Sequence, residues 1–325
     1  MQRLFLQEVA TRDGFQNEAR FIETVDKIAM IDALSQCGFA KIEVTSFTSF
    51  TSPKAITALR DAEAVMQGIR RNPAVEYTVL VPNVRGAERA LACNIDEANL
   101  VMSVSEPHNR SNLRMSREQS FAQLSEVVSV IGQGPVAINV SLSTVFGCPM
   151  QGDVPVGEVL HWVERFAELG ARGVTLCDTT GMAYPSQVEM LSRAVRERFP
   201  ALQLTLHFHN TRGMALANAL AAIEAGVDRF DSSLGGLGGC PYAPGASGNV
   251  CTEDLLHMLQ LMGFNTGVDL DRVLAVAAQL PGLVGHDIPS QILKAGKRLD
   301  LHPIPAHVAS LEKQVPSARA QELHS

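Results

Sequence analysis

The sequence predicts an α/β fold, a (β/α)8 TIM barrel with additional C-terminal helices. Short runs rich in β-branched residues alternate with helical patterns along the 325 residues. The runs recur about every 32 residues, which matches one strand–helix–strand repeat of roughly 30 residues. A repeat that occurs eight times closes into a barrel more economically than it forms an open sheet. The composition, 46% hydrophobic and 19% charged, is typical of a folded globular protein.

Each predicted strand is a short apolar run that ends at a polar or glycine-containing segment. The eight strands are expected to begin near Arg3, Ala40, Val75, Glu97, Val136, Arg172, Leu202 and Asp228. Helical patterns lie between them, among others at residues 23–37, 53–70, 156–169, 185–199 and 214–225. These elements together predict parallel strands joined by crossover helices.

The chain after the eighth strand predicts further helices. Residues 249–262 can supply the eighth barrel helix, and residues 270–279 form a second helical pattern that the barrel does not require. A segment containing Pro and His follows, and the last residues are expected to fray. We therefore expect a barrel domain with its C-terminal helices over residues 1–290 and a partly disordered tail over residues 291–325.

Composition and charge argue against several classes of function. The net charge is −7, and Lys and Arg are spread along the chain without forming a run, so we expect no nucleic-acid partner. No window approaches the roughly 18 apolar residues of a membrane span, and the N-terminal stretch does not resemble a signal peptide. The six cysteines lack the close spacing of a zinc site, so we expect reduced thiols and a cytoplasmic protein.

Polar side chains gather where the predicted strands end. Arg12 and Asp13 follow the first strand, Glu43 lies towards the end of the second, and Asp178 and Thr179 close the sixth. In a barrel, the loops that follow the strands share one face, and the reactive groups lie there. These residues are therefore expected around one mouth of the barrel.

Two histidines close the seventh predicted strand. His207 and His209 are two positions apart, so their side chains project to the same face. With Asp13 they can form a site of two histidines and one carboxylate for a divalent cation. Glu43 and Asn249 can reach the same mouth, and oxygen ligands favour Mg²⁺ or Mn²⁺. The alternative is a pair of buried, hydrogen-bonded histidines without a metal.

Arg12 and Asp178 each allow two interpretations. At the end of the first strand, Arg12 can offer a permanent positive charge to a developing enolate oxygen, although most Arg-Asp pairs are solvated surface residues. Asp178 can accept a hydrogen bond from a substrate hydroxyl or cap the next helix.

A glycine-rich segment follows the eighth strand. Residues 235–248 contain six glycines in 14 positions, which predicts a loop that can approach a ligand closely. No dinucleotide-binding pattern stands between a strand and a helix here. Cys240 is therefore predicted to be a thiol on a mobile, partly exposed loop, where a cysteine can act chemically.

Six segments of the chain resemble the 3-hydroxy-3-methylglutaryl-CoA lyase family, whose members are metal-dependent TIM-barrel lyases with an RDGxQ segment. The likeness runs in order over roughly residues 4–270. GGLGGCPYA together with GNVCTEDL is specific to this branch. The segments are EVATRDGFQNE (8–18), IEVTSF (42–47), FGCPMQGDV (146–154), LCDTTGMAYP (176–185), LHFHNTRGMALAN (206–218) and SLGGLGGCPYAPGASGNVCTEDL (233–255).

The resemblance implies a role for each matching residue. It implies that four residues are ligands of Mg²⁺ or Mn²⁺, namely Asp13, His207, His209 and Asn249. It implies that Arg12 stabilises the enolate, that Cys240 is needed for activity and that Glu253 is structural. Asp13 and His207 are also expected to take part in proton transfer. It also implies that Glu43 supports the metal site. Residues expected near the substrate are Glu43, Asp178, Thr179 and Arg212.

The chain departs from the usual family pattern at three places. Thr11 and Phe15 replace the usual Pro and Leu beside the RDG segment. The sequence HNTRG stands where HDTYG is typical, so Asn210 and Arg212 change the polarity near the metal. The segment SEPHNRSN (105–112) lacks the usual Phe and is predicted to form a loop that can touch the substrate.

The expected reaction is cleavage of 3-hydroxy-3-methylglutaryl-CoA to acetyl-CoA and acetoacetate, with an acyl-CoA thioester as the partner. The departures leave open the same chemistry on citramalyl-CoA or on a longer branched 3-hydroxyglutaryl-CoA. A Claisen-type acyl-CoA synthase and a non-catalytic acyl-CoA-binding barrel are further alternatives. By analogy with other barrels, the protein can form a homodimer.

Overall fold

Eight parallel strands form a closed barrel in the computed structural model, which describes residues 2–48, 57–132, 134–239 and 248–308. Each strand pairs with the next one in the sequence, and β8 returns to β1 with Phe5 opposite Arg229. The predicted fold class and all eight predicted strands are confirmed. The strands are β1 (Phe5–Glu8), β2 (Lys41–Ser46), β3 (Glu76–Leu80), β4 (Glu97–Ser103), β5 (Ala137–Ser143), β6 (Gly173–Asp178), β7 (Gln203–Phe208) and β8 (Arg229–Ser232).

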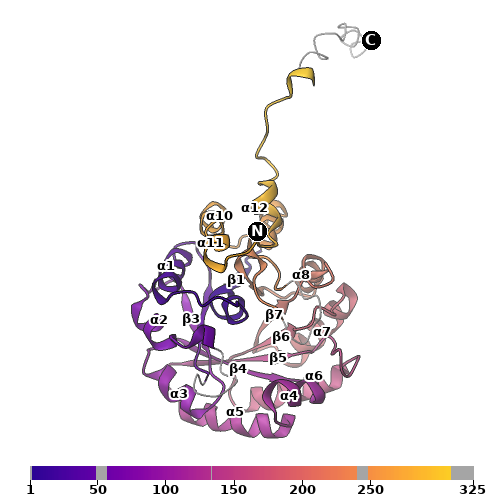
Figure 1. Cartoon of the computed structure of the whole chain (residues 1–325). Coiled ribbons are helices and arrows are strands. Elements are labelled where there is room, and N and C mark those ends of the chain that lie inside the picture. Colours follow the sequence, from indigo (N-terminus) through magenta and orange to yellow (C-terminus); the bar gives the residue numbers. More distant parts are fainter. Residues whose placement is uncertain (1, 49–56, 133, 240–247, 309–325) are drawn as a thin grey trace, which may run out of the picture.

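Helices surround the barrel (Figure 1). Those between the strands are α1 (Thr24–Leu34), α2 (Ala62–Gly68), α3 (Val84–Leu91), α4 (Glu106–Leu113), α5 (Arg117–Ile131), α6 (Val156–Glu168), α7 (Pro185–Arg198) and α8 (Ala215–Glu224). After β8 follow α9 (Thr252–Leu261), α10 (Leu270–Ala277), α11 (Leu280–Val284) and α12 (Gln291–Ala295). Three single turns also occur, η1 (Ala10–Gly14), η2 (Thr57–Leu59) and η3 (Leu234–Gly236).

The two faces of each strand differ in character. On β4, Ala98, Leu100 and Met102 belong to the apolar core between barrel and helices. Glu97 and Asn99 alternate with them and face the barrel interior. This alternation places an apolar layer outside the strands and polar side chains inside.

Polar side chains inside the barrel are held in a connected network. The ammonium group of Lys41 pairs with the carboxylate of Glu97. Higher in the barrel, Asn99 donates to Glu43 (Nδ2 to Oε1, 2.8 Å) and accepts from Asn139 (3.1 Å). A buried polar network of this kind is stable only when its members are paired, and it then orients them rigidly. The network therefore holds Glu43 in place directly below the mouth.

The segment SEPHNRSN forms a helix, so its prediction as a loop was wrong. Ser105 is the N-cap of α4, with its hydroxyl 3.4 Å from the backbone N–H of His108, and Pro107 lies in the first turn. A serine cap followed by an early proline favours the start of a helix. The polar composition hid this helix, because an eight-residue segment with few apolar residues shows no clear periodicity.

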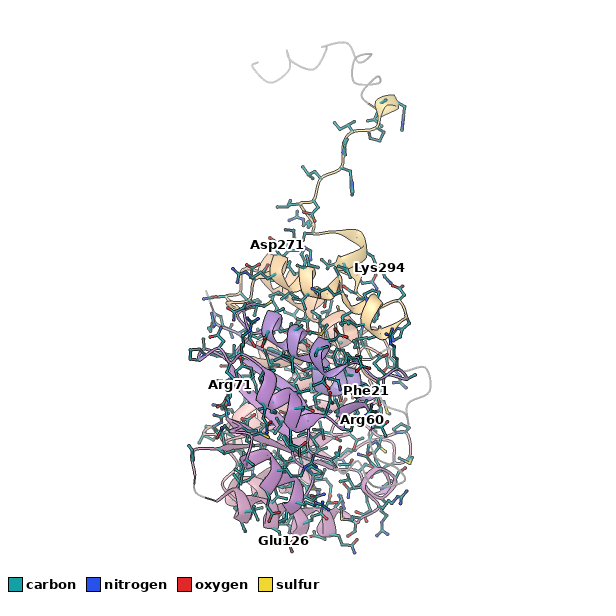
Figure 2. All side chains as sticks on the ribbon, turned by 60° about the vertical axis from the view of Figure 1, so that its left-hand side comes forward. Phe21, Arg60, Arg71, Glu126, Asp271 and Lys294 are labelled. Carbon is teal, nitrogen blue, oxygen red and sulfur yellow. The ribbon has the colours of Figure 1, made fainter. Side chains whose placement is uncertain are left out.

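The C-terminal helices α10 to α12 lie at one end of the molecule beside the N-terminus (Figure 1). Asp254 on α9 accepts hydrogen bonds from the backbone N–H groups of Gln291 and Ile292 (3.0 and 2.9 Å), which docks α12 on the barrel. Figure 2 shows Asp271 and Lys294 at this end and Glu126 at the other. The division near residue 290 stays a prediction, and residues 309–325 lie outside the described part.

No helix among the described residues combines the length and apolarity needed to cross a membrane.

Candidate active site

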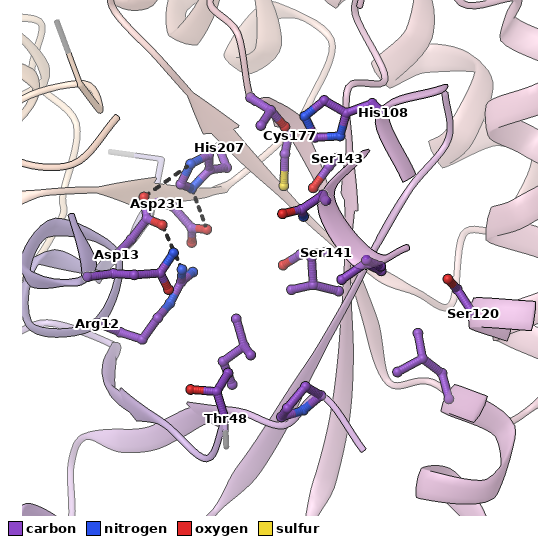
Figure 3. Close-up of a pocket in the computed structure, with 18 of the residues that line it drawn as sticks. Arg12, Asp13, Thr48, His108, Ser120, Ser141, Ser143, Cys177, His207 and Asp231 are labelled. Atoms are coloured by element: carbon purple, nitrogen blue, oxygen red, sulfur yellow. Dashed lines mark hydrogen bonds and ion pairs between the residues drawn. The ribbon is translucent and has the colours of Figure 1, made fainter. Parts of the chain in front are cut away.

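A single π-helical turn, η1, carries the first two site residues. The carbonyl oxygen of Val9 accepts hydrogen bonds from the backbone N–H groups of Arg12 (3.1 Å), Asp13 (2.7 Å) and Gly14 (3.4 Å). Such widened turns are rare and are frequently found at functional sites. Both Arg12 and Asp13 line the cavity at the barrel mouth, as Figure 3 shows.

Asp13 and the two histidines of β7 converge at this mouth. Each of Asp13, His207 and His209 offers one donor atom, and these atoms all lie within 4.8 Å of one another. The Nε2 atom of His207 lies 4.0 Å from Oδ2 of Asp13. Residues about 200 positions apart in the sequence therefore meet as the strand pattern predicts, in an arrangement suited to a cation.

Two buried atoms around these residues support a metal site. Within the described part of the chain, neither Nδ1 of His209 nor Oδ1 of Asn249 has a hydrogen-bond partner. Buried polar atoms are normally paired, so unpaired ones call for an explanation such as an ion. Imidazole nitrogen and amide oxygen are both donors for divalent cations. The residues present therefore fit the group that the resemblance implies.

The protonation states of Asp13 and His209 also suit a cation. Burial lowers the pKa of His209 to about 3, with a further contribution from His207, so its imidazole is neutral. Burial raises the pKa of Asp13, but Arg12 and the two histidines outweigh this and hold it well below its usual range. A carboxylate and a neutral imidazole are the forms that bind metals.

Asn249 approaches Asp13 from the far side of the glycine-rich segment. Its Nδ2 atom donates to Oδ2 of Asp13 (2.7 Å) and to the carbonyl oxygen of Leu237 (2.9 Å). Gly238 has a φ of +95°, and a Cβ atom there would lie 2.6 Å from Nδ2 of Asn249. Only glycine fits at this close approach. Cys240, the predicted loop thiol, lies outside the described residues.

Arg12 is held between two carboxylates. Its guanidinium pairs with Oε2 of Glu43 (2.6 Å) and with Oδ1 of Asp13 (2.6 Å). Burial lowers the pKa of Arg12, but Glu43 and Asp13 outweigh this and raise it above its usual value, so the group stays charged. The side chain is thus a fixed positive charge beside the proposed metal ligands.

The mouth holds a cavity of about 450 Å³, lined by Arg12, Asp13, Thr179 and both histidines.

Other residues predicted near the substrate are not among the described residues that line this cavity. Asp178 accepts from the backbone N–H groups of Met182 (2.7 Å) and Ala183 (3.0 Å), and burial raises its pKa to about 6.

Glu43 and Arg212 likewise make contacts within the protein. Glu43 lies below Arg12, with Asn99 on its other side. Arg212 donates to the carbonyl oxygens of Thr180 (3.0 Å) and Gly181 (2.7 Å). Neither residue is among the described residues that line the cavity. Their roles toward a substrate stay predictions.

Comparison with known proteins identifies the family. The family model described as HMGL-like matches residues 3–280 of the chain. The chain belongs to the HMGL-like family. It is 46% identical over 296 residues to a hydroxymethylglutaryl-CoA lyase of Bacillus subtilis, which covers 91% of this chain and 98% of the relative. It is 35% identical to an (R)-citramalyl-CoA lyase of Chloroflexus aurantiacus, over 91% of this chain and 96% of that one.

A solved structure agrees with this assignment. An HMG-CoA lyase of Acinetobacter baumannii, in complex with coenzyme A and 3-methylmalate, is 50% identical and superposes with a TM-score of 0.89. The match covers 93% of this chain and 98% of that structure. The HMGL-like barrel thus superposes on this structure over nearly the whole chain.

Asp231 is a residue of this HMGL-like site that sequence reasoning missed. It lies on β8 in register with His207, and its Oδ2 atom is 3.2 Å from Nδ1 of His207. Such a carboxylate fixes the ring orientation of a metal-binding histidine and leaves Nε2 for the metal. A signal was present in the sequence, because Asp231 lies within the predicted eighth strand, but its partner depends on strand register.

Replacing Asp231 by asparagine is expected to weaken metal binding and activity by roughly 10- to 100-fold, because His207 loses the carboxylate that orients it. Titration of the purified variant with Mn²⁺ measures the binding. Asp228→Asn is the matched control, since Asp228 precedes the strand and its nearest charged partner is Arg229 at 3.9 Å. Native Mn²⁺ affinity in Asp231→Asn would refute the positioning role.

Two further buried carboxyl groups brace the mouth of the HMGL-like barrel. Glu8 accepts hydrogen bonds from the backbone N–H groups of Ala10 (2.8 Å) and Leu234 (2.9 Å) and from the hydroxyl of Thr252 (2.7 Å). Glu253 accepts from the backbone N–H of Gly235 (2.9 Å). Glu8 therefore ties η1 to the start of the glycine-rich segment.

Glu8→Gln is expected to change how stability depends on pH. Burial raises the pKa of Glu8 from 4.5 to about 8, so the folded protein keeps a proton that the unfolded chain releases. The contribution of Glu8 is complete below pH 4.5 and is lost as the pH rises to about 8, by up to about 1.4 kcal/mol per pH unit. Urea unfolding should show that the free energy of unfolding of the variant, relative to that of the native protein, increases between about pH 5 and about pH 8. Parallel pH curves for the two proteins would contradict this.

Proposed function

We propose that the protein cleaves 3-hydroxy-3-methylglutaryl-CoA into acetyl-CoA and acetoacetate in a retro-Claisen reaction that needs a divalent cation. One observation carries the proposal, namely that a fixed cationic side chain and three side chains able to hold a metal ion face the same cavity. Arg12 supplies the first, and Asp13, His207 and His209 form the second. The hydroxymethylglutaryl-CoA lyases among the relatives support this substrate.

The residues that would hold the cation are Asp13, His207, His209 and Asn249. When bound, Mg²⁺ or Mn²⁺ supplies a Lewis acid for the hydroxyl and carboxylate oxygens of the substrate. The oxygen atoms of Asp13 and Asn249 favour these hard ions, and the described group of Asp13, His207 and His209 includes no cysteine.

The proposed reaction transfers two protons and breaks one carbon–carbon bond. The C3 hydroxyl loses its proton to Asp13 or to a base beside it, its oxygen forms the new carbonyl, and the C2–C3 bond breaks. The bonding electrons move to the thioester, whose oxygen gains negative charge. Arg12 stabilises that charge through its fixed guanidinium. A proton from Cys240 or His207 then completes the methyl group of acetyl-CoA.

A second substrate is favoured by one comparison. The relative from Chloroflexus aurantiacus is an (R)-citramalyl-CoA lyase. The same bond cleavage on citramalyl-CoA would release pyruvate in place of acetoacetate.

We also propose that the protein is cytoplasmic and that two copies form a homodimer. Neither property affects the chemistry at the barrel mouth.

The test is a product assay with purified protein and Mg²⁺. The protein is incubated separately with each of the two thioesters, and the acids released are identified by mass spectrometry. We expect acetoacetate and acetyl-CoA from 3-hydroxy-3-methylglutaryl-CoA. Release of pyruvate from citramalyl-CoA alone would favour the second candidate, and no cleavage of either ester would refute both.

A further inference from the structure

Two pairs of polar side chains connect β2 and β4 inside the barrel. In the first pair, Lys41 of β2 forms an ion pair with Glu97 of β4. Two positions further along each strand, nearer the mouth, Glu43 of β2 meets Asn99 of β4, with Oε1 and Nδ2 2.8 Å apart. One carboxylate thus faces a cation and the other a neutral amide. The structure therefore places a neutral donor beside the carboxylate that holds Arg12.

Hydrogen bonds from β5 fix the direction in which the amide of Asn99 points. Its Oδ1 atom accepts from Oγ of Ser141 (2.9 Å) and from Nδ2 of Asn139 (3.1 Å), which also donates to Oγ1 of Thr175 (2.9 Å). An amide oxygen has two acceptor lone pairs, and both are used here. A reversed amide would turn its oxygen toward the carboxylate of Glu43 and its NH₂ group toward that of Asn139. The NH₂ group of Asn99 therefore faces Glu43.

The two carboxylate oxygens of Glu43 are divided between Asn99 and Arg12. Oε1 accepts from the amide of Asn99, whereas Oε2 accepts from Nε of Arg12 (2.6 Å) and lies 2.6 Å from its Nη2 atom. Because a carboxylate is planar, a bond that holds Oε1 also fixes the direction of Oε2, and with it the place of the guanidinium. Arg12 lines the cavity, and Asn99 is not among the described residues that do. Asn99 therefore influences the cavity through Glu43 and Arg12.

The neutrality of Asn99 suits this contact. Glu43 is buried, and hydrogen bonds between a cation and a carboxylate are strong, so a Lys or Arg at position 99 would compete with Arg12 for it. An apolar residue at position 99 would leave Oε1 buried without its donor, which costs free energy and allows the carboxylate to turn. The amide of Asn99 holds Oε1 and leaves the negative charge of Glu43 to Arg12.

We propose that Asn99 is a positioning residue of the reaction, which fixes the guanidinium of Arg12 through the carboxylate of Glu43. This inference rests on the proposed function, in which Arg12 stabilises the charge of the enolate oxygen. Misplacing a reacting or catalytic group by roughly 1 Å can cost about 10²-fold in rate. Because the enolate charge develops in the transition state, the loss should appear in kcat rather than in KM.

The experiment measures kcat and KM for 3-hydroxy-3-methylglutaryl-CoA in Asn99→Leu, which keeps a branched side chain but removes the donor. We expect kcat to fall by about 10-fold or more and KM to stay within about 2-fold of the native value. Asn218→Leu is the matched control. Asn218 is a buried asparagine on α8 that donates to the carbonyl oxygen of Ala183 (3.1 Å) and is not among the described residues lining the cavity, so kcat should stay near native.

A double-mutant cycle distinguishes positioning of Arg12 from a general structural role of Asn99. In the Arg12→Met background, Asn99→Leu should lower kcat by less than about 2-fold further, because no guanidinium remains to be positioned. The same loss of kcat in both backgrounds would show that Asn99 acts independently of Arg12, and this result would overturn the inference.

The other kinetic outcomes are equally decisive. Native kcat in Asn99→Leu, or an effect on KM alone, would overturn the inference and leave the proposed function standing. Circular dichroism and Mn²⁺ affinity report the folding of each variant. Asn99→Ser, whose side chain is one atom shorter and does not reach Glu43, replaces Asn99→Leu if that variant does not fold. Absence of cleavage by the native protein would refute the proposed function, and the inference with it.

Discussion

Removing divalent cations with a chelator is expected to abolish cleavage of 3-hydroxy-3-methylglutaryl-CoA, and Mg²⁺ or Mn²⁺ should restore it. Asp13 and His209 have the protonation states of metal ligands, and without a cation none of the described groups at the mouth replaces its Lewis acidity. The rate of acetyl-CoA release measures the effect.

Two controls accompany the chelation experiment. Adding back a monovalent salt at equal ionic strength should leave the protein inactive, and circular dichroism should show an unchanged fold, because the barrel strands do not depend on the site. Full activity in protein shown to be free of metal would refute the assignment of Asp13, His207 and His209 as metal ligands needed for the reaction.

Replacing Arg12 by methionine is expected to lower kcat by at least roughly 10²- to 10³-fold, the usual cost of removing a preorganised stabiliser of developing charge. Arg12 lines the cavity and is held by Glu43 and Asp13, so its charge does not need to move during the reaction. Steady-state kinetics with 3-hydroxy-3-methylglutaryl-CoA give kcat and KM separately.

Variants at Arg12 and Arg70 distinguish the effect of the positive charge on the rate from the effects of side-chain geometry and of folding. Arg12→Lys keeps a positive charge but loses the planar fork, so it should recover only part of the rate. Arg70→Met is the matched control, since the Arg70 side chain is 87% exposed and pairs with Asp32, and neither residue lines the cavity. Near-native turnover in Arg12→Met, with the fold intact, would refute the proposal that Arg12 stabilises the enolate.

Most of the fold follows from local patterns. β7, for example, is an alternating run that places Leu204 and Leu206 in the core and His207 toward the mouth, so its period of two predicts its two faces. The barrel then follows from the repeat length. Helix α4 was missed because its start depends on the cap at Ser105, while its residues carry little apolar pattern.

The site was predictable where one element or one strand end determines it. The spacing of His207 and His209 alone puts both on one face, and the end of the first strand brings Asp13 to the same mouth. The partners of these groups were not predictable. Asp231 meets His207 through the register of β7 and β8, which the sequence does not specify.

Glu43 and Asp178 show the same limit. Glu43 pairs with Arg12 because the π-helical turn after β1 directs the guanidinium across to β2. The carboxylate of Asp178 accepts hydrogen bonds from two backbone N–H groups of the following turn. A residue type and a strand end indicate that a polar group belongs at the mouth, but the direction of a side chain depends on loop geometry.

Anomalous diffraction from crystals soaked in Mn²⁺ tests the central claim most directly. One strong peak at bonding distance from a carboxylate oxygen of Asp13 and from one ring nitrogen each of His207 and His209 is the predicted result. A peak bound elsewhere on the chain, or an occupied cation with these three side chains turned away from it, would contradict the account.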